Sequence, residues 1–331
     1  MSELLRQALE LELNTSKWHQ LVEAREDLTH RYRHPSDKKQ NFMTTEAHRD
    51  AYLAVRMPAT YAVIQRVLQE ILRRTGVENV KTLLDLGAGP GTAMWAAYQV
   101  FTTLESLTLI EQDAHLIKLG QRLMKHNSAL NPTAITWQAQ DLLNAPFFEP
   151  HDLIILSYSV GELAEEKVPT LIQKCWEATE RYLVVIESGT PQGFERIRAI
   201  RSRLIDLGAH LLAPCPHALA CPMMGGDWCH FAERVERSSL HRRLKGGSLG
   251  HEDEKYSYVI FSKQAYPLPQ GRVLRHPLKR SGHIHLHLCT PSGLKQEVVS
   301  RKTSEAYKQA RKVEWGDVYP DSTISSDENT L

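Results

Sequence analysis

From residue 81 to residue 189 the chain alternates short apolar runs with amphipathic segments, and this pattern limits the fold more than any other feature. Five runs rich in aliphatic residues end in polar residues or glycine: 81–89, 106–113, 134–141, 151–159 and 181–189. The segments between them have helical periodicity. Strands that alternate with helices predict a parallel, doubly wound sheet with helices on both faces. The predicted fold class is therefore α/β.

The flanking regions have a different hydrophobic pattern. Before residue 77 the chain looks helical, with Pro58 as a point where the helix restarts and Gly76 as its stop. Segments 209–214 and 256–263 are expected to complete a seven-stranded sheet, and three short strands with a helix near 303–312 follow. The predicted regions are a helical region at 1–76, an α/β domain at 77–264 that includes a cysteine-rich loop at 213–231, a basic β appendage at 265–320 and a disordered tail at 321–331.

A glycine-rich turn follows the first predicted strand, in LLDLGAGPGTAMWAA (83–97). Gly87, Gly89 and Gly91 allow backbone conformations and close approaches that side chains would block. A dinucleotide site has the pattern G-x-G-x-x-G, whereas this turn reads D-x-G-x-G-x-G, with Asp85 before the glycines. The pattern resembles motif I of class I methyltransferases that use S-adenosylmethionine (SAM). An acidic residue beside the turn suits the ammonium group of SAM better than a pyrophosphate.

Two further acidic residues follow the next two predicted strands. Glu111 ends the second strand, where a carboxylate can accept both ribose hydroxyls, and Asp141 follows the third, where the resemblance places a contact to adenine. A NAD site and a degenerate fold without a cofactor are the alternatives. The expected SAM-binding residues are Asp85, Gly87, Gly89, Gly91, Glu111 and Asp141.

The sequence predicts no catalytic residue. Methyltransferases that modify an exocyclic base nitrogen usually carry a [DNS]PP[FY] segment after the fourth strand, but residues 157–163 read SYSVGEL and lack both prolines. Cys175 lies in a helical segment, where a buried packing role is expected rather than that of a nucleophile. Glu162 is either a base or a carboxylate at a helix N-terminus.

Four of the five cysteines fall after residue 200. In a chain of cytosolic character such crowding favours metal binding or redox chemistry over disulfides. No C-x-x-C pair is present, which weakens a zinc-ribbon interpretation, and four thiolates are also what a [4Fe–4S] cluster needs. Zinc and simple packing of buried thiols are the alternatives, with His217 and His230 as rival ligands. The candidate ligands are Cys215, Cys221, Cys229 and Cys289, the last on an alternating strand segment.

Charge is distributed unevenly along the chain. Residues 231–315 contain 17 Lys and Arg against 8 Asp and Glu, although the whole chain has a net charge of +1. This excess predicts a polyanionic partner, RNA rather than DNA, with a solvated basic face as the alternative. The residues expected to meet phosphates are Arg234, Arg237, Arg242, Arg243, Lys245, Lys279 and Arg280.

Two expectations concern location. The sequence contains no run of 18 apolar residues, so no membrane span is expected. The first 18 residues carry three glutamates, which disfavours both a secretory signal and a mitochondrial transit peptide. We expect a cytoplasmic protein.

Several segments together resemble one family, the methyltransferase-like proteins of the small ribosomal subunit. The resemblance spans roughly residues 30–320 and rests on AYLAVRMPATYAV, LDLGAGPGTAMWAA, SYSVGEL, ESGTPQGF, CPHALACPMMGGDWCHF, EKYSYVIFSK, SGHIHLHLC and ARKVEWGDVYP. Mitochondrial members are small-subunit assembly factors, and bacteria carry cytoplasmic relatives. The resemblance implies a class I methyltransferase fold, association with small-subunit rRNA and a [4Fe–4S] cluster on Cys215, Cys221, Cys229 and Cys289.

Three functions are compatible with these features. The chain is interpreted first as an rRNA methyltransferase, because its motif I and the two following acids are complete. The second interpretation is a non-catalytic assembly or translation factor that binds SAM and rRNA, because the target-site motif is absent. A redox- or iron-responsive binding module is the third. In each case the cluster is expected to fasten the RNA-binding appendage to the main domain.

Overall fold

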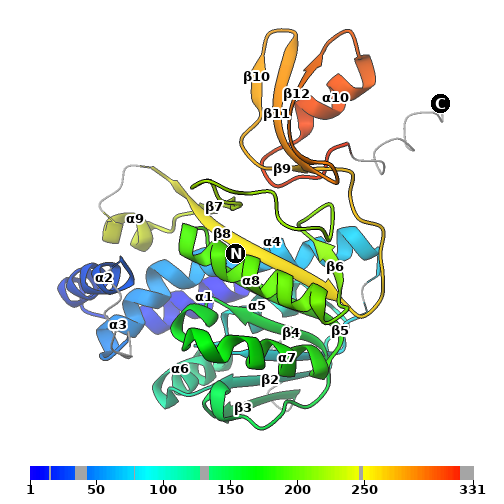
Figure 1. Ribbon diagram of the computed structural model, residues 1–331. Helices are drawn as coiled ribbons and strands as arrows, with labels where there is room; N and C mark the ends of the chain where they lie inside the picture. The colour runs from blue at the N-terminus through cyan, green and yellow to red at the C-terminus, as the bar shows by residue number, and fades with distance from the viewer. Residues whose placement is uncertain (15, 34–42, 78, 127–133, 246–248, 321–331) are drawn as a thin grey trace.

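The computed structural model describes the chain except residues 15, 34–42, 78, 127–133, 246–248 and 321–331. The predicted disordered tail, 321–331, lies outside the described residues. A large α/β domain carries a small β appendage on one side (Figure 1). None of the helices in the described ranges is long and apolar enough to cross a membrane.

The main sheet has eight strands, and its first five form the predicted parallel core. The strand order is β3-β2-β1-β4-β5-β8-β6, and β7 also pairs with β8. β8 runs antiparallel to β5, so the sheet is mixed. The strands are β1 (Thr82–Leu86), β2 (Ser106–Glu111), β3 (Ile135–Ala139), β4 (His151–Ser157), β5 (Thr179–Ser188), β6 (His210–Ala213), β7 (Phe231–Glu236) and β8 (His251–Ser262).

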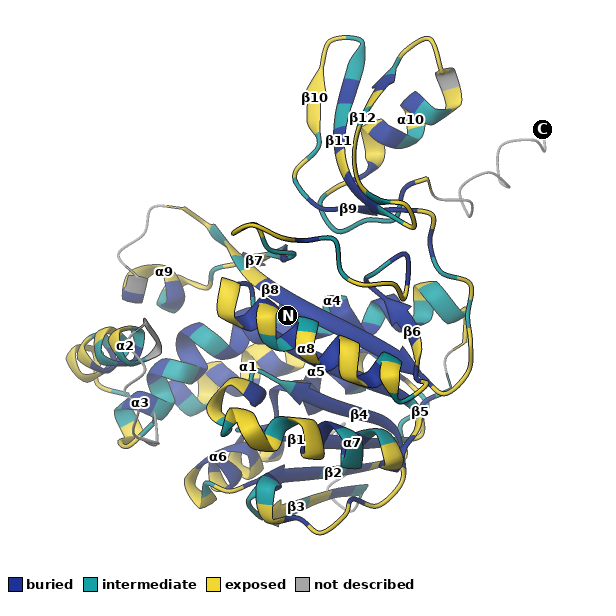
Figure 2. Cartoon of the chain, in the orientation of Figure 1, coloured by how far each residue is buried: buried dark blue, intermediate teal, exposed yellow. Residues whose placement is uncertain are grey.

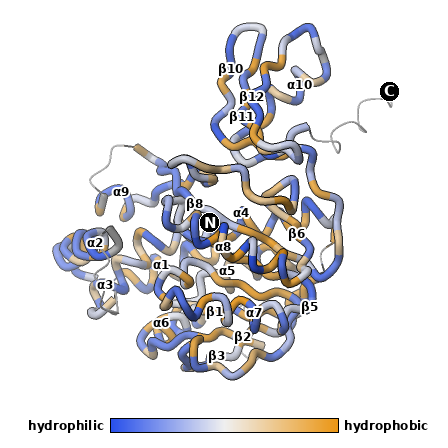
Figure 3. Tube along the Cα trace, in the orientation of Figure 1, coloured by the Kyte–Doolittle hydropathy of each residue, from blue (hydrophilic) through white to orange (hydrophobic). Residues whose placement is uncertain are grey.

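Helices cover both faces of the sheet, because successive strand residues point to opposite sides. Leu83 packs with the helices of one face and Leu84 with those of the other. Figures 2 and 3 show the central strands as buried and hydrophobic between the helix layers. One face carries α5 (Thr92–Val100) and α6 (Ala114–Lys125), and the other carries α7 (Val168–Ala178) and α8 (Pro191–Asp206).

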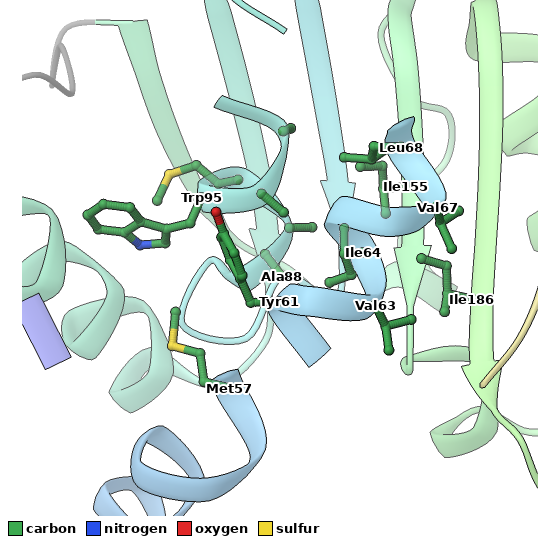
Figure 4. Close-up of a cluster of buried hydrophobic side chains, with 14 of the residues drawn as sticks. Met57, Tyr61, Val63, Ile64, Val67, Leu68, Ala88, Trp95, Ile155 and Ile186 are labelled. Atoms are coloured by element: carbon green, nitrogen blue, oxygen red, sulfur yellow. The ribbon is translucent and has the colours of Figure 1, made fainter. Parts of the chain in front are cut away.

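The N-terminal helices pack on the first of these faces and share its core. Figure 4 shows the apolar side of α4 against the strands and against Ala88 and Trp95, which lie in the glycine turn and in α5. Pro58 lies in the first turn of α4, and Gly76 ends it with φ +65°, both as predicted. The helices are α1 (Glu3–Leu13), α2 (Trp18–Arg33), α3 (Glu46–Ala51) and α4 (Met57–Thr75), with the π-helical turn η1 (Tyr52–Arg56) before α4.

The edge of the sheet differs from the predicted seven strands. β8 is 12 residues long; residues 260–262 pair with β6, and residues 251–256 pair with β7. β6 and β7 therefore form one edge strand interrupted by the cysteine-rich loop, residues 214–230. The sequence prediction missed β7 and the helix α9 (Ser239–Lys245). Charged residues in FAERVE and SSLHRRLK hide both elements from a hydrophobic pattern.

The appendage has four strands rather than the three predicted, because the expected strand at 271–277 contains only β9 and a further strand, β10, follows it. β11 pairs with β9, β10 and β12, and α10 packs against β11 and β12 near the predicted position. A separate small core lies beneath this helix. The elements are β9 (Arg272–Val273), β10 (Leu278–Arg280), β11 (His283–Thr290), β12 (Gly293–Ser300) and α10 (Ser304–Lys312).

Candidate cofactor site and cysteine cavity

The glycine turn lies at the carboxyl end of β1, where ligands bind in open α/β sheets. Gly87, Gly89 and Gly91 have φ values of +74°, +56° and +87°, which residues with side chains rarely adopt. A Cβ on Gly87 would lie 2.5 Å from the Cβ of Ser159, whereas a Cβ on Gly89 would meet nothing within 4 Å. The backbone at Gly89 is therefore open to a ligand.

Asp85 and Glu111 meet beside this turn, as expected from parallel strands. Glu111 accepts hydrogen bonds from the backbone N–H groups of Gly89, at 2.9 Å, and Asp113, at 2.8 Å. Asp85 has no exposed surface, and neither of its carboxylate oxygens forms a hydrogen bond of normal geometry in the described part of the chain, although the backbone N–H of Met94 lies near enough to lower its pKa. A buried carboxyl group without a partner is costly, so this position points to a bound polar group.

Asp141 is used differently. Its carboxylate caps the short helix η3 (Leu142–Asn144) by accepting from the backbone N–H of Leu143 at 2.9 Å and from the Asn144 side chain at 3.0 Å. Asp141 follows β3 at the same edge of the sheet, but its role as an adenine contact stays a prediction.

Two more acidic residues lie at the carboxyl edge of the sheet. The sequence interpretation missed one of them, Glu187. Glu187, near the end of β5, is 3% exposed and lies 3.4 Å from the guanidinium of Arg196. Glu162 follows β4 in the short helix η4 (Val160–Glu162). An acidic side chain thus stands at or after each of the five parallel strands. The sequence does contain a signal for Glu187, because it is an acidic residue near the end of a buried apolar run, like Asp85 in β1 and Glu111 in β2.

The concentration of carboxylates changes their protonation. Burial, with repulsion from Glu111, raises the pKa of Asp85 to about 7. Burial also raises the pKa of Glu187 to about 7, although the positive charge of Arg196 acts to lower it. The packing around Glu162, with repulsion from Glu111 and Glu187, raises its pKa to about 7 although the residue retains solvent exposure. The edge is therefore suited to a cationic ligand.

The loop after β4 closes against the glycine turn. Tyr158 has φ +58°, a conformation that is strained for a residue with a bulky side chain. Ser159 donates from Oγ to the backbone oxygen of Leu86 at 3.0 Å, which fixes the loop next to Gly87. Residues 157–159 therefore form a serine–tyrosine–serine turn attached to β1.

The four candidate cysteine ligands line one cavity of about 40 Å³. Cys215, Cys221 and Cys229 come from the loop between β6 and β7, and Cys289 comes from β11 of the appendage. The fifth cysteine, Cys175, is buried in α7 within a separate core cluster, as predicted. The fold thus brings together the set that the sequence singled out.

The cysteine cavity does not form a preassembled site for a single ion. Across the described residues, no three His, Cys, Asp or Glu side chains converge to hold one metal ion. His217 Nε2 lies 3.7 Å from the Cys289 sulfur, and no described contact joins His230 to the thiols. Burial, with the neighbouring cysteines, raises the pKa of Cys289 to about 12. Metal binding would therefore have to displace protons.

Basic residues that the sequence grouped together are divided by the structure. Arg234 and Arg237 pair with Asp253 and Glu252, and Arg243 lies over the ring of Trp18, so these three are engaged within the protein. Arg242 is exposed, and the side chain of Lys245 lies outside the described atoms.

Four exposed cations gather instead at the far end of the appendage. Lys279 and Arg280 lie on β10, and the backbone N–H of Arg301 bonds the oxygen of Gly282 at 2.9 Å, which brings Arg301 and Lys302 alongside. No carboxylate among the described residues pairs with these four side chains. Figure 2 shows this end as largely exposed and distant from the main domain. We call Lys279, Arg280, Arg301 and Lys302 the basic tip.

Comparison with known proteins places the chain in a family. A family model described as mitochondrial small ribosomal subunit Rsm22 matches residues 46–320. The chain belongs to the Rsm22 family. The predicted resemblance to methyltransferase-like small-subunit proteins is thereby confirmed at the level of the family, and the strand order gives the α/β fold of class I methyltransferases.

Curated Rsm22 relatives come from mitochondria of eukaryotes. The human protein named "Ribosome assembly protein METTL17, mitochondrial" is 29% identical over 307 residues, covering 87% of this chain and 66% of its own length. The "Rsm22-cox11 tandem protein 2, mitochondrial" of Schizosaccharomyces pombe is 27% identical over 325 residues, covering 82% of this chain and 43% of its own length. The chain therefore spans less than two thirds of these relatives.

Solved structures match this chain at low sequence identity and with low TM-scores. The magnesium protoporphyrin IX methyltransferase of Synechocystis with bound SAM covers 74% of this chain and 97% of its own, with 12% identity and a TM-score of 0.43. Likeness at this level carries no argument about substrate.

Proposed function

We propose that this Rsm22-family chain binds SAM at the carboxyl edge of its sheet and acts in assembly of the small ribosomal subunit. The assembly role rests on the family and on the name of the human relative. The SAM site rests on the acidic edge around the glycine turn. SAM carries a sulfonium and an ammonium group, so a row of carboxyl groups complements its charge, whereas a dinucleotide would be repelled.

The observation that carries the SAM proposal is Asp85. It is fully buried beside an open glycine backbone, and neither carboxylate oxygen forms a hydrogen bond of normal geometry within the described residues. In this proposal Asp85 faces the cationic methionine part, Glu111 faces the ribose hydroxyls, and Gly89 gives the ligand access to the backbone. Bound SAM would supply an electrophilic methyl group at this edge.

Calorimetry with SAM tests the site. Wild-type protein is expected to bind, and Gly89→Arg is expected to abolish binding because its side chain enters the open space. Gly208→Arg is the matched control, since Gly208 also has positive φ and nothing within 4 Å of its Cβ position, but lies after α8. Absence of heat with wild type, or an equal reduction of binding in both variants, contradicts the proposal.

Methyl transfer to rRNA is the first candidate for what the site does. The complete acidic edge favours it, with Glu162 as the exposed carboxyl group able to hold a proton near pH 7. A non-catalytic role is the second candidate. The loop after β4 favours this second role, because Ser159 is packed against Gly87 and bonded to Leu86, and the usual proline pair is missing.

Mass spectrometry of rRNA from cells with and without the protein distinguishes these two roles. A methyl group that is lost without the protein, and restored by wild type but not by Gly89→Arg, supports catalysis. Unchanged modification with accumulated small-subunit precursors supports the assembly role alone.

We propose that the basic tip contacts rRNA phosphates. Residues 271–312 contain 10 Lys and Arg against 2 Asp and Glu, and the four tip cations are exposed and unpaired among the described residues. Phosphate contacts give affinity and register without reading sequence.

Replacing the four tip residues with alanine is expected to weaken binding to small-subunit rRNA. The slope of log K against log salt should also fall by about 0.7 to 0.9 for each phosphate that the variant no longer neutralises. Lys295→Ala/Lys308→Ala is the matched control, because these two cations of the appendage are already paired with Glu297 and Glu305. An unchanged slope in the tip variant contradicts the proposal.

We propose that the four cysteines bind an iron–sulfur cluster, with zinc as the alternative. A zinc ion needs every sulfur about 2.3 Å from one point, and no three ligands in the described part of the chain converge in that way. In a [4Fe–4S] cluster each thiolate binds a different iron, so the four cysteines that line one cavity match the ligand number of such a cluster. Cys289 would join the appendage to the loop.

Iron and acid-labile sulfide, measured after anaerobic purification, test the cluster. Wild type and Cys175→Ala are expected to contain both, and Cys229→Ser is expected to lose most of them. A colourless protein that carries zinc, or equal iron in all three, contradicts the cluster. The cytoplasmic location predicted from the sequence stays a prediction and can be checked by cell fractionation.

A further inference from the structure

Arg201 is a buried cation without a counter-charge in the described residues. It lies on α8, is 4% exposed and forms no ion pair with a described carboxylate. Its Nη2 donates to the backbone oxygens of His217, at 2.7 Å, and Leu219, at 2.8 Å, so it holds the cysteine loop. Its Nε has no acceptor among the described atoms. A buried charge is stable only when an opposite charge compensates it.

Arg272 is the second buried cation on the same cavity. It lies on β9, is 1% exposed and donates from Nη1 to Glu70 Oε2 at 2.9 Å and from Nε to the oxygen of Pro214 at 2.8 Å. Glu70 provides one negative charge, but Nη2 of Arg272 is buried and has no acceptor among the described atoms. Even with Glu70 counted, the two arginines leave one positive charge uncompensated.

Both arginines line the cavity that the four cysteines line. His217 lines it as well, with Nε2 3.7 Å from the Cys289 sulfur. Two buried guanidinium nitrogens without acceptors at one cavity, Arg201 Nε and Arg272 Nη2, are unusual, since buried donors are normally satisfied. A group that carries negative charge and acceptor atoms would satisfy them together.

We propose that Arg201 and Arg272 are the counter-charges of the anionic group that the four cysteines bind. This inference rests on the cluster proposed above and concerns two residues outside its ligand set. Four thiolates give the bound group a net negative charge, and the two guanidinium groups offset that charge in a buried site. Charge and hydrogen bonds around a cluster set its reduction potential, so both arginines should raise the potential and slow cluster loss.

The test compares anaerobically reconstituted wild type with Arg201→Met and Arg201→Lys. Two quantities are measured: the midpoint potential by spectroscopic redox titration and the rate of iron release to a chelator. Arg201→Met is expected to have a more negative potential and to release iron about tenfold faster or more, the usual scale for residues that support metal ligands. Arg201→Lys keeps the charge and should remain close to wild type in potential.

The matched control is Arg203→Met, on the same helix. Arg203 bonds the side chain of Gln173 in an exposed contact, away from the cavity. If Arg201→Met does not fold, as judged by circular dichroism, Arg201→Gln makes the same comparison while keeping an amide donor for the loop carbonyls. A purely structural role would change folding stability but leave the potential of the folded variant unchanged.

The outcomes separate this inference from the cluster itself. If wild type contains a cluster and Arg201→Met has the same potential and release rate as wild type, the proposed role of the arginine is wrong. The cluster proposal is unaffected by that result. Wild type that takes up neither iron nor sulfide overturns the cluster, and the inference with it. A lowered potential in Arg201→Met but not in Arg203→Met supports the inference.

Discussion

At the scale of single residues, position along the chain predicts which side chains meet but not what each one does. Asp85 and Glu111 lie at the carboxyl ends of neighbouring parallel strands and are close enough to repel each other. Asp141 has the same kind of position, yet its carboxylate caps the turn that follows. Arg201 and Arg272 carry no motif, and their importance comes from burial and from long-range contacts, which a sequence pattern does not contain.

Asp85 gives a prediction about pH. Its folded pKa of about 7 lies above its ordinary value of 3.8, so folding favours the protonated form. Its contribution to stability is therefore full below about pH 4 and is lost as pH rises through 7. Stabilisation by SAM should be greater at pH 8 than at pH 5.5, because the cation compensates the carboxylate.

Thermal denaturation with and without SAM at both pH values checks this. Asp85→Asn should reduce, though not remove, the loss of stability between pH 4 and 7, since Glu162 and Glu187 titrate in the same range. The explanation fails if SAM stabilises wild type equally at both pH values.

Gly87 gives a prediction about packing. Gly87→Ala places a Cβ 2.5 Å from that of Ser159 and in a positive-φ conformation, so it should reduce the free energy of unfolding by about 2 kcal/mol or more. Gly89→Ala is the control, because it has the same sign of φ but open space, and should cost about 1 kcal/mol. Equal destabilisation of both variants in urea denaturation would show that the packing of Ser159 on Gly87 is unimportant.

At the scale of elements, the sequence predicts strands and helices whose apolar pattern is continuous and misses those built from charged residues. β1, β2, β4 and β5 are largely apolar runs, because the interior of a parallel sheet is buried on both faces, whereas the edge strand β3 is mostly exposed. β7 and α9 contain several charged residues and gain their structure from neighbouring elements, β8 for the strand. Three of the four appendage strands were predicted, but β10, with only the residues LKR, was missed because it is defined by its pairing with β11.

The contact between α4 and β9 gives a prediction at this scale. Glu70→Gln leaves the buried Arg272 without its carboxylate partner and should lower the free energy of unfolding by about 3–5 kcal/mol. Arg73→Ala removes only the exposed 3.5 Å contact to the same glutamate and should change it by less than about 1 kcal/mol. Chemical denaturation measures both, and similar small effects would mean that the buried pair is not important for stability.

At the scale of the whole molecule, one cavity joins parts of the chain that are far apart in sequence. Its walls come from α8, the cysteine loop, β8 and the appendage. The sequence predicted the four thiols as one set, but the cavity, its charges and the basic tip required the fold. An occupied cavity would connect the appendage to the main domain by bonds as well as by packing.

Removal of the cluster is therefore expected to loosen the appendage. Hydrogen exchange in β9 and β11 should become faster when a chelator removes iron from wild type, while exchange in β1 and β4 should stay the same. Cys229→Ser should exchange like the iron-free protein, and Cys175→Ala like wild type. Equal exchange in β9 and β11 with and without iron would show that the cluster does not fasten the appendage.

The interrupted edge strand has a consequence for self-association. An exposed sheet edge with a long, regular row of unpaired backbone groups is a template for another chain. β6 and β7 together would form such an edge along β8, but the loop between them breaks the row after Ala213 and restarts it at Phe231. The segment that brings the cysteines together therefore also shortens the row of backbone groups with which the edge of another sheet could pair.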